Sequence, residues 1–286
     1  MNYRYSLHKI YNREHCTFDT HEYSRFKFGN VLYAEKFAKE LFQGFVSEYG
    51  DLILKQNQII LLPSPHHTIP TASSYLCSFF KRELNFFLFR NEKSTSVESK
   101  IYRNQTYVQD YGNMNYEERL RLISNDTYYI DKEFIEGKFC ILIDDIKITG
   151  SHEDTVNRIL KEYNVSGNFL FLYYAELMNS HIHPNIENDY NYAAVKKIED
   201  LLHIVTDTNF RFNTRVIKYV LLMGERNFEF LIEGMSEEQK RELFYLAISN
   251  NYHLINEYKC NINKLWQLIY KKDREKVSLH RNLPLV

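Results

Sequence analysis

A short apolar run that ends in two adjacent carboxylates constrains this chain more than any other stretch. Residues Phe139–Ile143 are continuously apolar and rich in branched side chains, and Asp144 and Asp145 follow directly. A continuous apolar run is typical of a strand that is buried on both faces of a parallel sheet. Sheets of this kind bind ligands beyond the carboxyl ends of their strands. The two carboxylates therefore lie where a ligand site is expected.

The residues after the two carboxylates predict a turn and then a helix. Thr149, Gly150 and Ser151 combine a glycine with two hydroxyl side chains, and a helical pattern follows from His152 onward. Backbone N–H groups at the N-terminus of a helix bind anions, so the turn is a candidate phosphate site. Carboxylates that hold hydroxyl groups, next to such a turn, fit a sugar phosphate. The alternative is a ligand-free turn whose helix is simply capped by Ser151.

The complete order of strand, Asp-Asp, three residues, Thr-Gly and helix resembles the PRPP-binding motif of type I phosphoribosyltransferases (PRPP is 5-phosphoribosyl 1-pyrophosphate). The resemblance implies that Asp144 and Asp145 hold the ribose hydroxyls and that residues 149–152 hold the 5-phosphate. The chain departs from the family pattern at Ile148 and His152, where hydroxyl residues are usual. Two acidic residues, Glu153 and Asp154, also follow where small or apolar residues are usual.

A second strand and loop extend the resemblance. Residues Ile59–Leu62 predict another buried strand, and a proline-containing loop leaves its carboxyl end before a helical pattern. This arrangement resembles the pyrophosphate-binding loop of phosphoribosyltransferases, which places Ser64, His66 and His67 near the leaving pyrophosphate. Many relatives use Lys or Arg there, and this loop has neither. The histidines are then neutral hydrogen-bond donors or, alternatively, ordinary surface residues; their spacing does not favour a metal site.

The polar segment Asn91–Asn115 has little periodicity and predicts a loop that closes over the ligand. Together with Glu118-Arg119 it is similar to a segment of the ComF-like branch of the superfamily, with Arg103, Thr106, Gln109 and Arg119 in the matching order. The resemblance implies that Arg103 and Arg119 take part in catalysis. The alternative is that both arginines are solvated surface charges.

The pattern along the chain predicts an α/β fold followed by an all-α domain. Strand and helix patterns alternate as far as Phe169–Tyr174, which favours a parallel, Rossmann-like sheet of the phosphoribosyltransferase type. A polar stretch with Pro184 follows, and the remaining patterns are helical. We therefore expect a phosphoribosyltransferase-like domain over residues 1–180 and a helical C-terminal domain over residues 190–286.

Several single elements are predicted with the same rules. Residues 2–30 are assigned either to a hood over the acceptor base or to an edge hairpin. A helix is expected over Val31–Tyr49 with a stop at Gly50, and a strand over Phe86–Arg90. Ser236 begins a capping box. The C-terminal helical patterns cover Asn191–His203, Thr214–Met223, Glu237–Ser249 and Ile262–Lys272.

Composition narrows the classes of function. The net charge of −1 over 286 residues gives no general attraction to nucleic acid or anionic membranes, so a nucleic-acid factor ranks last. The four cysteines are scattered, with no metal-ligand spacing, and they favour a reducing compartment. The N-terminus lacks an apolar signal core and no run is long enough to span a membrane, so a cytoplasmic location is expected.

The favoured function is a transferase that moves ribose 5-phosphate from PRPP to a small-molecule acceptor and releases pyrophosphate. The expected cofactor is Mg²⁺, held mainly through PRPP oxygens and water rather than by protein ligands. The alternative is a PRPP- or nucleotide-binding regulatory module with little or no turnover. The C-terminal helices suit a protein partner or a second copy of the chain. The sequence leaves the acceptor open.

Overall fold

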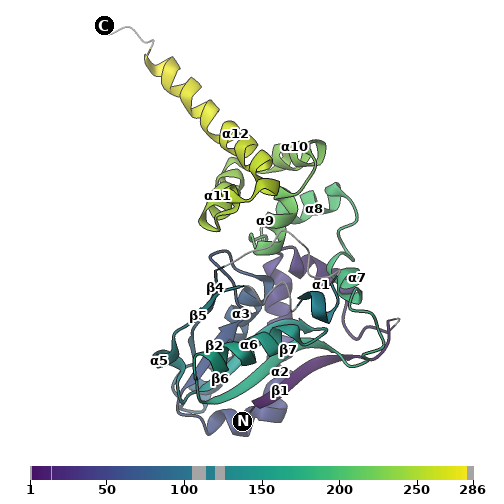
Figure 1. The fold of residues 1–286 in the computed structure, drawn as a ribbon, viewed down its shortest axis with the longest axis vertical. Helices are drawn as coiled ribbons and strands as arrows, with labels where there is room; N and C mark the ends of the chain where they lie inside the picture. The colour runs from purple at the N-terminus through teal and green to yellow at the C-terminus, as the bar shows by residue number, and fades with distance from the viewer. Residues whose placement is uncertain (1, 14, 105–113, 120–125, 282–286) are drawn as a thin grey trace.

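A parallel sheet of five strands forms the centre of the N-terminal part (Figure 1). The computed structural model describes residues 2–13, 15–104, 114–119 and 126–281. In spatial order the strands are β1 (Asn2–Ile10), β7 (Asn168–Leu177), β6 (Phe139–Lys147), β2 (Ile59–Pro63) and β3 (Val97–Glu98). Every neighbouring pair is parallel. The predicted α/β class is confirmed, and the two strands that precede the candidate ligand loops lie side by side.

Helices cover both faces of this sheet. They are α1 (Thr20–Lys27), α2 (Val31–Leu54), α3 (Ala72–Arg90), α5 (Lys132–Ile135) and α6 (Ser151–Glu162). One apolar core lies between the sheet and α1, α2 and α3. A second lies on the other face, beneath α6 and the antiparallel pair β4 (Ile101–Arg103) and β5 (Tyr128–Ile130). Side chains of β6 alternate between these two cores, which decides where its carboxylates point.

The opening residues do not form an edge hairpin, so that alternative is wrong; the hood over an acceptor stays a prediction. The segment gives β1 and α1, and β1 pairs in parallel with β7, with Tyr5 opposite Leu172. Tyr3, Tyr5 and Leu7 alternate along β1 and pack on the core beneath α2. This burial outweighs a local hairpin, which would leave the same side chains in water.

Two helices differ from their predicted limits. The helix that begins at Val31 was expected to stop at Gly50, but α2 continues to Leu54 because Ile53 is fully buried. Such burial exceeds the roughly 1 kcal/mol that glycine costs inside a helix. The predicted strand Phe86–Arg90 is wrong and belongs to α3. Leu84 and Leu88, four residues apart, are buried on one helix face.

The segment Asn91–Asn115, expected to be a loop, contains the short strands β3 and β4. Thr106 and Gln109 lie outside the described residues. The expectation of a loop throughout is therefore wrong for its first half, where Ile101 is fully buried in the second core. A single apolar residue in a polar segment gives too short a pattern to predict such a strand.

The C-terminal helices, residues 186–281, are called the helical region below. They are α7 (Ile186–Asn191), α8 (Ile198–Val205), α9 (Thr214–Leu221), α10 (Glu225–Gly234), α11 (Glu237–Ser249), η2 (Tyr252–Leu254) and α12 (Asn256–Arg281). Helix α11 and its capping box from Ser236 confirm the prediction, whereas α10 was not predicted. Figure 1 shows α8 to α12 gathered at one end of the sheet.

The helical region has its own apolar core, and two residues from the sheet part enter it. Phe28, just after α1, and Ile69, in the loop after β2, are both fully buried in this core. The backbones also meet, because Asn30 forms an antiparallel bridge with Phe210. The helical region therefore contacts the segments that leave α1 and β2, close to the carboxyl ends of the central strands.

Candidate active site

The two carboxylates of β6 point to opposite faces of the sheet. Ile141 and Ile143 pack in the core under α1 to α3, whereas Cys140 and Leu142 pack in the core under α6. The same alternation sends Asp145 toward α1 and leaves the side chain of Asp144 on the face of α6. One strand end thus carries two acidic groups in different surroundings.

Asp145 is held inside the protein by α1. Its Oδ2 lies 2.5 Å from the Nζ of Lys27, and the hydroxyl of Tyr23 donates a hydrogen bond to the same oxygen. Burial alone would raise the pKa of this carboxyl, but the Lys27 ammonium and the hydrogen bonds outweigh it and lower the pKa. Asp145 therefore also joins the end of β6 to α1 inside the protein.

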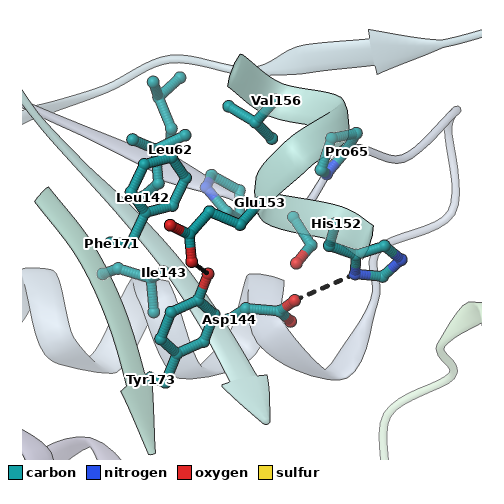
Figure 2. Close-up of a pocket in the computed structure, with 12 residues that line it drawn as sticks. Leu62, Pro65, Leu142, Ile143, Asp144, His152, Glu153, Val156, Phe171 and Tyr173 are labelled. Atoms are coloured by element: carbon teal, nitrogen blue, oxygen red, sulfur yellow. Dashed lines mark hydrogen bonds and ion pairs between the residues drawn. The ribbon is translucent and has the colours of Figure 1, made fainter. Parts of the chain in front are cut away.

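Asp144 faces a cavity. Its side chain is 14% exposed, its Oδ2 lies 3.2 Å from the Nδ1 of His152, and its Oδ1 accepts the backbone N–H of Asp145 at 2.9 Å. Figure 2 shows Asp144 and His152 pointing toward each other from β6 and α6. Burial raises the pKa of Asp144, and the charge of Asp145 adds to this, while His152 and Ser64 oppose it. A ligand that donates hydrogen bonds would stabilise the ionised form.

The turn between β6 and α6, residues 147–152, is called the phosphate turn here. Gly150 has a φ of +84° and lies just before Ser151, the first residue of α6. The hydroxyl of Thr149 donates to the Ser151 Oγ at 3.1 Å and accepts the Ser151 backbone N–H at 3.4 Å. The left-handed conformation favours glycine there, and the first N–H groups of α6, which have no partner within the helix, lie at the end of α6 next to this turn.

A cavity of about 610 Å³, partly open to solvent, lies beside the phosphate turn and is called the turn cavity. Both carboxylates and the whole phosphate turn, including Lys147, line it, as do three basic side chains from other parts of the chain: Lys27, Arg119 and Arg215. Helix N-terminal N–H groups and cations around one cavity form a site for an anion with several charges.

Most of these cations already have a carboxylate partner. Arg119 is 2.8 Å from Glu187, and Lys147 is 2.8 Å from Glu176. Glu153, the acidic residue at the start of α6, is 2.6 Å from Arg4 and accepts the Tyr173 hydroxyl at 3.2 Å (Figure 2). The charge of Glu153, one of the two acidic residues that depart from the family pattern, is therefore balanced by Arg4 from β1.

A smaller cavity of about 290 Å³ shares Asp144, His152, Glu153 and Tyr173 with the turn cavity. It is lined by Ser64 and Pro65 from the loop after β2, and by His152 and Val156 from α6 (Figure 2). The register of the sheet explains the meeting, because Pro63 pairs with Ile143 and the next residue of each strand therefore lies at the same edge. Ser64 therefore lines the same cavity as Asp144 and His152, although 80 residues separate Ser64 from Asp144.

The loop after β2, residues 64–70, is called the β2 loop. The backbone of His66 pairs with β4, since its N–H donates to Ile101 O at 3.3 Å and its O accepts the Arg103 N–H at 3.2 Å. The His66 Nδ1 is 3.0 Å from Ser64 O, and burial lowers the pKa of His66 to about 4. Its ring is therefore neutral near pH 7, as expected for a hydrogen-bond donor.

His67 contacts the helical region instead of the cavities. Its Nδ1 lies 3.2 Å from the Oδ1 of Asn250, and that oxygen also accepts the backbone N–H groups of Thr68 at 3.0 Å and Ile69 at 3.1 Å. Neither His66 nor His67 is among the described residues that line the two cavities. The Lys100 ammonium donates a hydrogen bond to His67 O and so brings a positive charge to this loop. Lys100 was not predicted as a site residue.

The two arginines of the ComF-like segment have different surroundings. Arg119 is 4% exposed and lines the turn cavity. Arg103 forms an ion pair with Asp126, Nε to Oδ2 2.5 Å, and is not among the described residues that line either cavity. Neither arginine is the solvated surface charge of the alternative interpretation. The structure brings Arg119 to the other candidate residues and gives Arg103 a place next to the β2 loop.

Lys27, Lys147 and Arg215 were not predicted as site residues. Lys27 and Arg215 reach the cavity from α1 and α9 through long-range packing, so no local pattern carries their signal, whereas Lys147 lies three residues after Asp144 and could have been included. Among the described residues, no three His, Cys, Asp or Glu side chains gather in a way that could hold a metal ion. Across that same part of the chain, every helix is too short or too polar to cross a bilayer.

Comparison with known proteins adds the following. Residues 1–265 match the family described as PRTase ComF-like, where PRTase stands for phosphoribosyltransferase. Among solved structures, a hypoxanthine phosphoribosyltransferase from Staphylococcus aureus is similar, with 10% sequence identity, a TM-score of 0.28, and coverage of 51% of this chain and 75% of that chain. No curated protein matches. The family match extends through the sheet and most of the helical region.

Proposed function

The chain belongs to the ComF-like phosphoribosyltransferase family, and from this premise we propose that it binds PRPP and transfers its ribose 5-phosphate to a small-molecule acceptor, releasing pyrophosphate. The observation that carries the proposal is the turn cavity, where the N-terminus of α6, four basic side chains and the Asp144 carboxylate surround one space. PRPP carries anionic phosphates and a ribose ring with hydroxyl groups. The helix N-terminus and the basic side chains match the phosphates, and the Asp144 carboxylate matches the hydroxyl groups.

In the proposed complex, the phosphate turn holds the 5-phosphate through the N–H groups of α6 and the hydroxyls of Thr149 and Ser151. Asp144 accepts hydrogen bonds from the ribose hydroxyls, and His152 fixes its orientation at 3.2 Å. Asp145 acts indirectly, since it holds Lys27 beside the same cavity. The pyrophosphate extends toward Ser64 and the β2 loop, where Lys100 supplies positive charge.

The reaction breaks the bond between the anomeric carbon and the pyrophosphate oxygen and forms a bond from that carbon to an acceptor nitrogen or oxygen. Positive charge develops on the ring as pyrophosphate leaves. The Asp144 carboxylate at the cavity favours this charge, and the cavity walls position the two reactants. No protein nucleophile is required.

The expected Mg²⁺ fits these residues in a limited way. Asp144 is the partly exposed carboxylate of the cavity, at 14%, and it would hold the ion directly or through water, while phosphate oxygens supply the other ligands. The ion would neutralise charge on the pyrophosphate. We further propose a cytoplasmic location, since all four cysteines are free thiols.

A second candidate is PRPP binding with little turnover, as in a regulatory module. Two observations favour it: the β2 loop has no Lys or Arg of its own, and Lys27 already occupies Asp145. The test is a pyrophosphate-release assay with PRPP, Mg²⁺ and a panel of purine and pyrimidine bases, alongside calorimetric titration with PRPP. Release with one base identifies the enzyme; binding with no release identifies the module; no binding contradicts both.

A further inference from the structure

Six consecutive residues of the helical region are bonded to two different parts of the proposed ligand site. Residues 209–214 end at the first residue of α9 and are called the connector here. The connector bonds both to the segment that joins α1 to α2 and to the β2 loop. Its own aromatic side chains, Phe210 and Phe212, are buried in the core of the helical region and pack edge to face. The connector is therefore anchored in one part of the protein and bonded to two others.

The first set of bonds reaches the segment after α1. The Val31 N–H donates to Asn209 O at 2.9 Å, and the Arg211 N–H donates to Gly29 O at 2.8 Å. Gly29 has a φ of +93°, and a Cβ on it would lie 2.3 Å from Arg211 O. Only a glycine avoids that clash, and it also adopts this φ without strain. The close approach of the two backbones therefore depends on the glycine.

Asn213 extends this backbone contact to a residue of the turn cavity. It is fully buried, its Oδ1 accepts the Val216 N–H at 3.0 Å, which caps α9, and its Nδ2 donates to Lys27 O at 3.0 Å. Lys27 lines the turn cavity, and its Nζ is 2.5 Å from the Asp145 carboxylate. An ammonium has three N–H donors, so a phosphate in the cavity can accept another of them. One side chain thus holds both the start of α9 and the backbone of a cavity cation.

Thr214, the next residue, bonds to the β2 loop instead. Its N–H donates to Pro70 O at 2.9 Å, and its hydroxyl donates to Ile69 O at 3.1 Å. The β2 loop leads to these two carbonyl groups from Ser64, which lines the smaller cavity. Asn213 and Thr214 therefore hold different parts of the site, although they are neighbours in the sequence.

We propose that Asn213 is a positioning residue, which holds the Lys27 ammonium at the turn cavity so that it binds the 5-phosphate of the ligand. This inference rests on the proposed function, because it assigns the 5-phosphate of PRPP to Lys27. Thr214 has the matching role for the β2 loop, toward which the pyrophosphate of the same ligand extends. The helical region then takes part in ligand binding through the connector.

Asn213→Ser in the full chain tests this role, because serine caps a helix about as well as asparagine but has no amide group to reach Lys27 O. We expect its affinity for ribose 5-phosphate to fall about 3- to 10-fold, the loss typical of one hydrogen bond, and its affinity for inorganic pyrophosphate to stay unchanged. Thr214→Val should show the reverse, with weaker binding of pyrophosphate and unchanged binding of ribose 5-phosphate. Calorimetric titration measures all four affinities.

The matched control is Ser236→Ala, which removes the cap of another helix in the same region, α11. It should lower the melting temperature and leave both affinities unchanged. Thermal unfolding of every variant shows whether it is folded. Asn213→Thr, which also keeps the cap, replaces Asn213→Ser if the smaller serine leaves the buried position too loosely packed to fold.

The outcomes separate this role from the proposed function. If the wild type binds neither ribose 5-phosphate nor PRPP with Mg²⁺, the proposed function fails and the role of Asn213 fails with it. If the wild type binds both and a folded Asn213 variant binds ribose 5-phosphate equally well, the proposed function stands and the role of Asn213 is overturned. Equal losses for ribose 5-phosphate and pyrophosphate in that variant also overturn it, because they would indicate general damage to the site.

Discussion

The phosphate turn and the β2 loop lie side by side at the ends of neighbouring strands, yet they are held in different ways. The phosphate turn is stabilised by its own residues, with Gly150 in a left-handed conformation and Thr149 bonded to Ser151. The β2 loop is held from outside, by β4 on one side and by Asn250 of the helical region on the other. The first is local in sequence and the second depends on the whole fold.

The comparison has a functional consequence. A locally held turn keeps its shape when distant parts of the chain move, which suits a fixed anchor for a phosphate. The conformation of the β2 loop depends on the position of the helical region, because Asn250 holds it. Such a loop suits the pyrophosphate end of the ligand, from which the leaving group departs. The following predictions test this difference, beginning with the largest expected effect.

Asp145→Asn should lower the free energy of unfolding the most, by about 3–5 kcal/mol, because it leaves the buried Lys27 ammonium without its carboxylate. Urea unfolding measures the effect, with Asp51→Asn, an exposed site on α2, as the control. Replacing both partners with apolar residues, Lys27→Met with Asp145→Leu, should recover much of the loss. A loss below about 1 kcal/mol in Asp145→Asn would mean that the strand end needs no support from α1.

His66 should make stability depend on pH, because burial lowers its pKa from 6.5 to about 4. Between these values the unfolded chain binds a proton that the folded protein does not, so the stability present above pH 6.5 is lost as the pH falls toward 4. The loss is about 3 kcal/mol at most. Urea unfolding at pH 4.5 and pH 7 should show a smaller difference in His66→Gln, and an unchanged one in the exposed control His21→Gln.

If His66→Gln kept the full pH dependence of the wild type, the β2 loop would not hold a neutral histidine, and its packing against β4 would be looser than described.

Asn250→Ala should release the β2 loop, because it removes the oxygen that accepts the N–H groups of Thr68 and Ile69. We expect a loss of about 2 kcal/mol in stability. Calorimetric titration should show weaker binding of pyrophosphate and unchanged binding of ribose 5-phosphate. The exposed Asn227→Ala on α10 is the control. If Asn250→Ala weakened the binding of pyrophosphate and of ribose 5-phosphate equally, the β2 loop and the phosphate turn would not differ in how they depend on the helical region.

Thr149→Val should give the smallest effect and the opposite selectivity. It removes the hydroxyl that bonds Ser151 and faces the turn cavity. Affinity for ribose 5-phosphate should fall by about 1 kcal/mol, whereas pyrophosphate binding should not change. Binding of ribose 5-phosphate at wild-type affinity would place the phosphate elsewhere.

The same contrast explains what the sequence could predict. The strand, carboxylates, turn and helix around Asp144 lie within about two dozen consecutive residues, so their pattern predicts β6, the phosphate turn and α6. Lys27 reaches Asp145 across 118 positions and Asn250 reaches His67 across 183. Contacts of that separation depend on how the elements pack, and no local pattern carries them.

Errors in the elements have the same origin. The strand expected at Phe86–Arg90 came from a short aromatic run, and the burial of Leu84 and Leu88 by the sheet makes it the end of α3. The alternation of β6 could have been used to place Asp144 and Asp145 on opposite faces. Which side chain contacts each carboxylate follows only from the fold: His152 contacts Asp144, and Lys27 contacts Asp145.

The central claim is that PRPP binds at the carboxyl end of β6 with its ribose at Asp144. Calorimetric titration with PRPP and Mg²⁺, on the wild type, Asp144→Asn and the exposed control Asp51→Asn, tests it most directly. The account predicts saturable binding by the wild type and the control, and an affinity about 10- to 100-fold lower in Asp144→Asn with unchanged thermal unfolding. Wild-type affinity in a folded Asp144→Asn, or no binding by the wild type, would contradict it.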